Sequence, residues 1–190
     1  MKKILIINAH PKKESFNFAI AETYKKSAEA NNAEVKQINL YNLQFEPFLH
    51  DFNDEVSDDI KKAQDFITWA EHLVWIYPTW WSTMPAIVKA FIEQTFRPDF
   101  AFKYKKSDKF VKWDKYLTNK SARIISTMDS PPLYYAMVVK DPGFKTMKDI
   151  FKFCGIKPVK RTYFGSVKHS SDEQRKKWLK QVEVLGRNFK

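Results

Sequence analysis

The chain has 190 residues, of which 44% are hydrophobic and 16% aromatic, so it can bury one substantial core, and its length is typical of a single domain over residues 1–190. The apolar run near the N-terminus is too short for a signal peptide, and no stretch approaches the ~18 apolar residues of a membrane span, so we expect a cytoplasmic protein with no integral membrane segment. The net charge of +11 comes from lysines dispersed along the chain, which favours attraction of phosphate-bearing ligands and predicts no nucleic-acid partner.

Short apolar segments alternate with amphipathic segments along the chain. The apolar segments predict strands over residues 3–8, 34–40, 72–77, 121–127 and 160–167. The amphipathic segments predict helices over residues 15–30, 59–70, 85–96, 143–154 and 170–185, the last with Ser171 and Gln174 at capping-box spacing. The acidic stretch 50–59 reads as an exposed connection.

This alternation predicts an α/β fold, a doubly wound sheet of five parallel strands with helices on both faces. We expect the strand order 2-1-3-4-5. In such sheets ligands bind beyond the carboxyl ends of the strands, where the first and third strands diverge. The prediction therefore directs attention to three loops, residues 9–14, 78–84 and 128–135.

The first loop and the helix start after it read NAHPKKESFN, with His10, Lys12, Lys13 and Ser15 before the helix. A helix N-terminus offers free N–H groups and a positive dipole end, which suits a phosphate. The chain has only four glycines and no G-x-G-x-x-G or Walker A motif, which disfavours dinucleotide binding of the Rossmann type. From these residues alone, a phosphate site and an ordinary capped helix start are equally good interpretations.

The second loop, YPTWWSTMP, places Trp80 and Trp81 between a buried strand and a helix that begins with proline. Two adjacent indoles at the ligand-binding edge can pack against a planar ring cofactor, and nearby backbone N–H groups can bond its polar edge. The alternative interpretation is a core cluster that takes up one of the indoles.

The third loop, STMDSPPLYYAM, combines hydroxyl groups, two prolines and the pair Tyr134 and Tyr135. A phenol held by a rigid loop can donate a hydrogen bond to a ring carbonyl or a substrate. The alternative is that either tyrosine only covers the edge of the sheet.

Two further features carry weaker signals. Cys154 is the only cysteine and has apolar neighbours in FKFCGIKP, so we expect a buried small side chain and not a catalytic thiol; no disulfide or metal site is predicted. The stretch from Lys103 to Lys115 alternates basic and aromatic residues, which predicts either an anion-binding segment or a solvated loop with packed aromatics.

Taken together, the three loops resemble those of the flavodoxin-like NAD(P)H dehydrogenase (quinone) family, which includes bacterial modulator-of-drug-activity and general-stress flavoproteins. The opening resembles the family pattern of an apolar strand, AH, a polar stretch and SFN. The middle resembles P-x-x-W-x-x-x-P-A-x-x-K, here from Pro78 to Lys89, and FCGIKPVKRTYFGSVKHSSDEQRKKWL resembles the closing strand and helix. The order and spacing of these segments extend over nearly the whole chain.

The resemblance implies a set of residues around a bound flavin. For the ribityl-phosphate or pyrophosphate these are His10, Ser15, Phe16, Asn17 and Ala19, with Gln64 near the diphosphate and adenosine end. For the ring they are Pro78, Thr79, Trp80, Trp81 and Ser82, together with Ser126, Thr127, Met128 and Asp129. Tyr134 matches the active-site tyrosine of the family.

The sequence departs from the family pattern at two places. Met128 and Asp129 replace a glycine pair, which puts the close approach of backbone to the ring in question. The histidine that accompanies the tyrosine in animal members is absent, since Val139 and Lys140 stand near that position, so a proton relay through such a pair is not expected.

The implied function is hydride transfer from NADPH or NADH through the flavin to a quinone or a similar small-molecule acceptor. FAD is the expected flavin, with FMN as the alternative. The resemblance also implies a homodimer whose stretch from Lys103 to Lys115 contributes to the neighbouring pocket. Other interpretations are a nitroaromatic, azo or flavin acceptor, a regulatory subunit of a potassium-efflux or stress system, and a flavodoxin-like scaffold without flavin.

Overall fold

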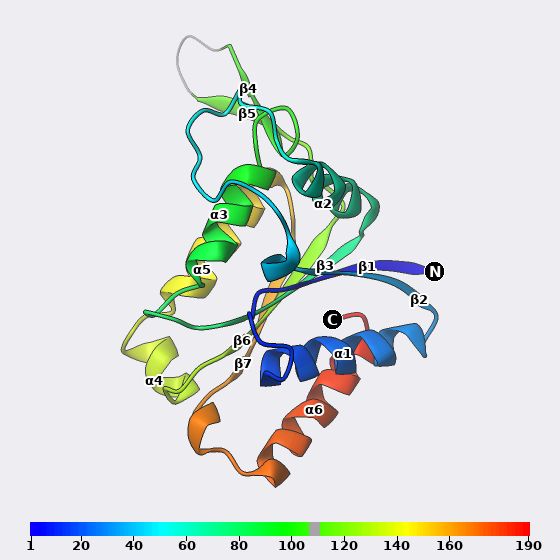
Figure 1. The fold of residues 1–190 in the computed structure, drawn as a ribbon, viewed down its shortest axis with the longest axis vertical. Coiled ribbons are helices and arrows are strands. Elements are labelled where there is room, and N and C mark those ends of the chain that lie inside the picture. The colour runs from blue at the N-terminus through cyan, green and yellow to red at the C-terminus, as the bar shows by residue number, and fades with distance from the viewer. Residues whose placement is uncertain (107–110) are drawn as a thin grey trace.

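A five-stranded parallel sheet runs through the middle of the structure, a computed structural model that describes residues 1–106 and 111–190 (Figure 1). Its strands are β1 (Lys2–Asn8), β2 (Ala33–Asn39), β3 (His72–Pro78), β6 (Ser121–Thr127) and β7 (Val159–Phe164). They lie in the order β2-β1-β3-β6-β7. The five predicted strands thus stand in the predicted relative order, and two strands that the sequence did not predict lie between the third and the fourth along the chain.

The sheet is covered on both faces, which explains why its central strands contain unbroken apolar runs such as residues 4–7 and 73–76. Alternate residues of β1 point to opposite faces, so Leu5 and Ile7 enter one core and Ile4 and Ile6 the other. Helices α1 (Phe16–Glu29) and α6 (Asp172–Arg187) pack on one face, and α2 (Asp58–Trp69), α3 (Ala86–Thr95) and α5 (Pro142–Cys154) on the other (Figure 1).

Serine side chains fix where three of these helices begin. Ser15, Ser57 and Ser171 are N-caps, and each side-chain oxygen accepts a hydrogen bond from the backbone N–H three residues on. The cap at Ser171 accepts from Gln174 at 3.2 Å, at the predicted position. Helix α5 ends at Gly155, whose φ of 103° requires glycine, so the turn at this end follows from the sequence.

The predicted loops and strand ends differ from the structure in three places. Strands β4 (Phe102–Lys105) and β5 (Lys112–Lys115) form an antiparallel pair where no strand was predicted. The third loop contains a short helix, α4 (Pro132–Met137), and short 3-10 helices η1 (Leu40–Asn42) and η2 (Val167–His169) follow β2 and β7. Strand β7 stops at Phe164, before the predicted end at residue 167, because Gly165 lies against Pro132 and Ser166 adopts a φ of 54°.

The β4–β5 pair is attached to the body of the protein by its aromatic residues. The Trp113 ring stacks on Phe153 of α5 with centroids 4.6 Å apart, and its indole N–H donates to the Phe153 carbonyl at 2.9 Å. The predicted contribution of the stretch from Lys103 to Lys115 to a neighbouring pocket falls partly on residues 107–110, which lie outside the described residues. Within residues 1–106 and 111–190, no helix combines the length and apolar character needed to cross a membrane.

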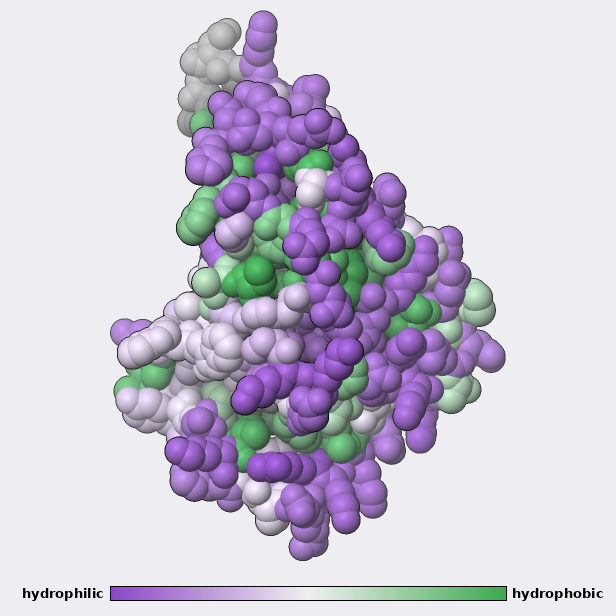
Figure 2. All heavy atoms as spheres, in the orientation of Figure 1, coloured by the Kyte–Doolittle hydropathy of each residue, from purple (hydrophilic) through white to green (hydrophobic). Residues whose placement is uncertain are grey.

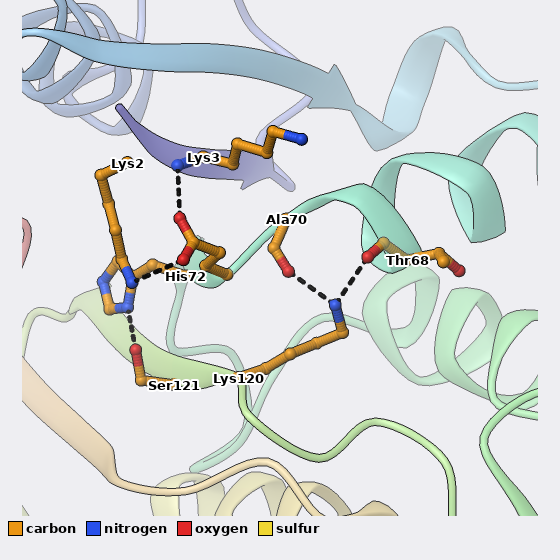
Figure 3. Close-up of polar contacts among 8 residues, drawn as sticks. Lys2, Lys3, Thr68, Ala70, His72, Lys120 and Ser121 are labelled. Carbon is orange, nitrogen blue, oxygen red and sulfur yellow. Dashed lines mark hydrogen bonds and ion pairs between the residues drawn. The ribbon is translucent and has the colours of Figure 1, made fainter.

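At the opposite edge of the sheet, where the strands begin, His72 is buried among basic groups. The side chain is 3% exposed, and its Nδ1 lies 2.8 Å from the Ser121 hydroxyl (Figure 3). Burial lowers the pKa of His72 to about 4, and the positive charges of Arg123, Lys2 and Lys160 add to the effect. The imidazole is therefore neutral at neutral pH.

This buried histidine predicts acid sensitivity of the fold. Since the unfolded chain binds a proton near pH 6.5 and the folded one only near pH 4, His72 contributes stability above pH 6.5 that is lost as the pH falls towards 4. The loss amounts to up to about 3 kcal/mol at 1.36 kcal/mol per pKa unit. Urea unfolding at pH 7.5 and pH 5 should show a smaller pH dependence for His72→Gln than for the wild type.

The exposed His50 offers the matched control, because His50→Gln removes a histidine without removing a buried one. Equal pH dependence of the wild type and His72→Gln would contradict the assignment of this sensitivity to His72.

Candidate functional site

The three predicted loops meet at the carboxyl edge of the sheet and are tied together by hydrogen bonds. The Thr79 N–H donates to the Thr127 carbonyl at 2.7 Å, and the Thr79 and Ser126 hydroxyls are 2.6 Å apart. The Ala9 N–H donates to the Ile76 carbonyl at 2.9 Å. These contacts join the ends of β1, β3 and β6, so the loops that follow these strands surround one area, as expected at the switch point of such a sheet.

A basic hollow lies where the first loop meets the start of α1. Its volume is about 300 Å³, and residues from the first loop, α1, β6, η2 and α6 line it: His10, Lys12, Glu14, Ser15, Phe16, Asn17, Thr127, Val167 and Arg175. Five of the predicted site residues therefore share one cavity. The free N–H groups of the first turn of α1, together with Lys12 and Arg175, make it suitable for a phosphate.

Asn17 contributes a buried amide to this hollow. The residue is 2% exposed, and its Oδ1 accepts a hydrogen bond from the Thr127 hydroxyl at 2.6 Å. Its Nδ2 is buried and has no hydrogen-bond partner among the described residues. A buried donor without a partner is costly, so a ligand oxygen in the hollow would supply the missing acceptor.

His10 is oriented by its own loop. Its Nδ1 accepts a hydrogen bond from the Lys12 N–H at 3.1 Å, which leaves the proton of the neutral ring on Nε2. Partial burial is the main cause that lowers the pKa of His10, and the positive charge of Lys12 lowers it further. The His10 ring also meets the Trp80 ring edge-on at a centroid distance of 6.3 Å. His10 thus connects the basic hollow with the second loop, whose residues 80–83 form the tryptophan turn.

Arg175 lines the basic hollow and was not among the residues predicted from the sequence. It lies near the start of α6, and its guanidinium donates to the Ser170 hydroxyl at 3.0 Å and the Val167 carbonyl at 3.3 Å. These bonds direct the side chain into the basic hollow. No local sequence pattern points to Arg175, because a basic residue in the last helix is ordinary and only the packing of α6 against α1 brings it near the first loop.

The tryptophan turn is tight and exposes its indoles. The Trp80 N–H donates to the Thr83 carbonyl at 2.9 Å, and the Thr83 N–H donates back to Trp80 at 3.1 Å. Trp81 is 99% exposed and Trp80 43%. Among the described residues, the N–H groups of Trp81 and Ser82 have no recorded backbone acceptor. The turn therefore presents flat aromatic surface and free donors together, and neither indole belongs to a closed core.

An apolar hollow adjoins the same turn. Its volume is about 890 Å³, and its lining comes from the tryptophan turn, α3, the segment after β2 and α5: Tyr41, Pro47, Phe48, Trp80, Trp81, Thr83, Met84, Pro85, Ala86, Ile87, Lys89, Ala90, Glu93 and Thr146. Most of the face shown in Figure 2 is hydrophilic, and hydrophobic residues show in several separate places, among them the middle of the face. A large flat organic molecule fits a hollow of this character.

In the third loop, hydrogen bonds within the protein hold Met128 and Asp129, and neither residue needs the backbone freedom of glycine. The Met128 N–H donates to the Phe164 carbonyl at 2.9 Å, and the Asp129 carboxylate accepts from the Lys168 N–H at 3.0 Å. Met128 is buried and neither residue has a positive φ, so the backbone here does not require glycine. Because the Met128 N–H is already bonded, it is not a free donor for a ligand.

The two tyrosines of the third loop have different surroundings. Tyr134 is 52% exposed on α4, and no hydrogen bond of its hydroxyl is recorded among the described residues. Tyr135 is 3% exposed, and its hydroxyl donates to the Ser82 carbonyl at 2.8 Å. Tyr134 is thus accessible to a ligand, while Tyr135 is part of the framework.

The other predicted residues have mainly structural contacts. Phe16 packs on Phe164 and Trp178, Ala19 is half-buried on α1, and Pro78 ends β3. Gln64 lines neither hollow, and its amide donates to the Thr95 carbonyl at the end of α3 at 3.0 Å. Its flavin contact stays a prediction. Cys154 is 2% exposed, and burial raises the pKa of its thiol to about 12, against a smaller lowering by Lys115, which suits a structural role.

Comparison with known proteins identifies the family to which this fold belongs. The model of the flavodoxin-like fold family matches residues 2–185. The chain belongs to this family. An uncharacterised NAD(P)H oxidoreductase of Haemophilus influenzae is 30% identical over 181 residues, spanning 90% of this chain and 88% of the relative. NAD(P)H dehydrogenase [quinone] 1 of Rattus norvegicus is 23% identical, over 97% of this chain and 78% of its own. These names support an enzyme of the NAD(P)H oxidoreductase kind.

Solved structures agree with the fold. The crystal structure of Smu.1420 from Streptococcus mutans UA159 superposes with a TM-score of 0.81 at 38% identity, covering 98% of this chain and 99% of the other. An FMN-dependent NADH-azoreductase from Bacillus anthracis, in complex with FMN, superposes with a TM-score of 0.76 at 19% identity, over 100% and 99% of the two chains. The second similarity shows the fold alone.

Proposed function

We propose that the protein is a flavin-dependent oxidoreductase that passes a hydride from NADPH or NADH through its flavin to a quinone or a similar small electrophile. The observation that carries the proposal is the meeting of two unlike hollows at one sheet edge. The basic hollow suits the phosphate of a flavin and the apolar hollow suits flat rings. His10 lines the first and Trp80 lines the second, and their ring centroids are 6.3 Å apart. A bound flavin accepts a hydride from a nicotinamide and delivers the electrons to a second substrate.

The phosphate end of the flavin is assigned to the basic hollow. Lys12 and Arg175 supply positive charge, the His10 Nε2–H and the Asn17 amide supply donors, and the start of α1 supplies backbone N–H groups. Charge-assisted hydrogen bonds of this type are about twice as strong as neutral ones. The residues present therefore fit a phosphate group.

The ring end is assigned to the tryptophan turn and the third loop. The free N–H groups of Trp81 and Ser82 can bond the polar edge of a flavin ring, and the exposed indole of Trp81 can pack against its flat surface. Tyr134 is the proposed catalytic residue, because its exposed phenol is free to donate a proton or a hydrogen bond to the substrate.

We also propose that the protein forms a homodimer. A further apolar cavity of about 520 Å³ lies along α3 and α5, lined by Ile92, Phe96, Phe102, Ile150, Phe153 and others. Phe48 and Phe52 beside α3 are 70% and 55% exposed. Exposed apolar surface of this kind marks interaction sites, which supports a homodimer formed through this face.

Purification of the protein decides the proposal. The expected result is a yellow protein, or one that becomes yellow with FMN or FAD, whose flavin absorbance is bleached by NADPH or NADH without oxygen and restored by a quinone. Titration with FMN and FAD selects the flavin, and rates with quinones and azo compounds select the acceptor class. A protein that binds neither flavin would overturn the proposal, and flavin binding without turnover would favour a regulatory subunit.

Truncation of Trp81 tests the ring end. Trp81→Ala should weaken flavin binding by about ten-fold or more, since stacking on an indole is lost, while stability changes little because the side chain is 99% exposed. Fluorescence titration measures affinity and thermal unfolding measures stability. Trp69→Phe on α2, remote from the turn, is the control. Unchanged affinity in Trp81→Ala would place the ring elsewhere.

Neutralisation of Arg175 tests the phosphate end separately. Arg175→Gln should weaken binding of FMN by about ten-fold, through loss of a charge-assisted contact, and leave binding of riboflavin, which has no phosphate, almost unchanged. Lys177→Gln on the same helix is the matched control, since Lys177 is exposed and pairs with Glu173. Equal effects on FMN and riboflavin would show that Arg175 acts only on the fold.

A further inference from the structure

The tryptophan turn has a backbone conformation that its own residues disfavour. Trp81 has a φ of 49° and Ser82 a φ of 64°, and the two hydrogen bonds between Trp80 and Thr83 close a two-residue turn around them. Turns with two positive φ angles normally contain Asn-Gly or a similar pair, because other residues are strained there. A Trp-Ser pair therefore needs contacts from outside the turn to hold this shape.

Tyr135 supplies such a contact. Its hydroxyl donates to the carbonyl of Ser82 at 2.8 Å and accepts a hydrogen bond from the Gly143 N–H at 3.1 Å. The side chain is 3% exposed and its ring meets that of Tyr163 edge-on, so the phenol has little freedom to move. One buried oxygen thus joins the turn to the start of α5.

Gly143 allows this close approach. A Cβ at residue 143 would lie 2.8 Å from the Tyr135 hydroxyl and 3.3 Å from the Cα of Thr83. The first turn of α5 therefore packs directly against the tryptophan turn and the phenol. Any side chain at this position would displace one of them.

The start of α5 is in turn fixed from the sheet. Asp141 is 3% exposed, has a φ of 57°, and its carboxylate accepts hydrogen bonds from Arg161 and Tyr163 of β7. Its backbone N–H donates to the Tyr135 carbonyl at 3.2 Å. The position of Gly143, and through it of the Tyr135 hydroxyl, is therefore set by β7.

We propose that Tyr135 is a positioning residue for the flavin ring. Its hydroxyl bonds the Ser82 carbonyl and thereby fixes the conformation of the turn. In that conformation the free N–H groups of Trp81 and Ser82 and the indole of Trp81 are placed to contact the ring. This inference rests on the proposed function and adds a role for the buried tyrosine beside that of Tyr134. It differs from a catalytic role, because the Tyr135 hydroxyl is already bonded on both sides by the protein.

Tyr135→Phe tests the inference by removing one oxygen. Flavin affinity should fall by about three- to ten-fold, the range of one lost hydrogen bond. The visible absorbance and circular dichroism bands of the bound flavin should shift, and in the flavin-free protein the Thr83 amide should exchange with solvent faster. Tyr24→Phe is the matched control, since Tyr24 is fully buried and its hydroxyl has no partner among the described residues.

A variant that only lowers the stability of the fold should not reproduce the changes expected for Tyr135→Phe. Ile67→Val truncates a buried side chain of α2 and touches none of these groups, so it should leave the flavin bands and Thr83 exchange unchanged. The inference would be overturned if Tyr135→Phe had the flavin affinity, the flavin bands and the Thr83 exchange rate of the wild type. It would also be overturned if Ile67→Val lost as much flavin affinity as Tyr135→Phe and changed the bands and the exchange rate equally. If the wild type binds no flavin, the proposed function fails, whereas amide exchange still reports whether the hydroxyl holds the turn.

Gly143→Ala provides a second approach through the same oxygen. The added Cβ should weaken flavin binding in the wild-type background, because it collides with the Tyr135 hydroxyl. In Tyr135→Phe that collision is relieved, so the two changes together should weaken binding by less than the product of the separate factors. Strictly multiplicative effects would contradict a shared contact.

Discussion

The site depends on the hydrogen bonds that hold the carboxyl ends of β1, β3 and β6 in register. Thr79 is bonded to β6 twice, through its N–H to Thr127 and through its hydroxyl to Ser126. Thr127 in turn bonds Asn17 of α1. A parallel sheet brings its carboxyl ends to one edge, but these backbone and side-chain contacts determine how the first loop, the tryptophan turn and the third loop face one another.

The two halves of the site are built on opposite physical principles. The basic hollow gathers donors and positive charge at the start of a helix, where an anion replaces water with little cost. The apolar hollow exposes indoles and aliphatic groups that water solvates poorly. A molecule that carries a phosphate at one end and a flat ring at the other satisfies both halves, whereas a simple anion or an apolar molecule satisfies only one. The net charge of +11 is expected to add a general attraction for such ligands.

How much of this could be predicted depends on whether the signal was local. The buried strands and capped helices were predicted because their periodicity and their capping serines lie within a few residues, as at Ser171 and Gln174. The β4–β5 pair was missed because its stability comes from Trp113 stacking on Phe153, forty positions away in the chain. Arg175 was missed for the same reason. For the tyrosine pair, covering the sheet edge was an open alternative for either residue, and only the fold shows that Tyr135 is the buried one.

The shortage of glycine explains the character of the site. The chain has four glycines, yet Trp81, Ser82, Lys140, Asp141 and Ser166 all adopt positive φ angles in the segments that follow β3, β6 and β7. Each such residue costs roughly 1–2 kcal/mol when it has a side chain. At Ser82 and Asp141 the strained backbone is held by buried polar contacts from Tyr135, Arg161 and Tyr163. Glycine adopts a positive φ without strain, so a glycine-rich loop needs no outside contacts to hold such a turn. Here the residues have side chains, and contacts from neighbouring elements hold the backbone in this conformation. Met128 and Asp129, which stand where the family resemblance implies a glycine pair, are consistent with this principle: the Met128 N–H donates to the Phe164 carbonyl, and the Asp129 carboxylate accepts from the Lys168 N–H.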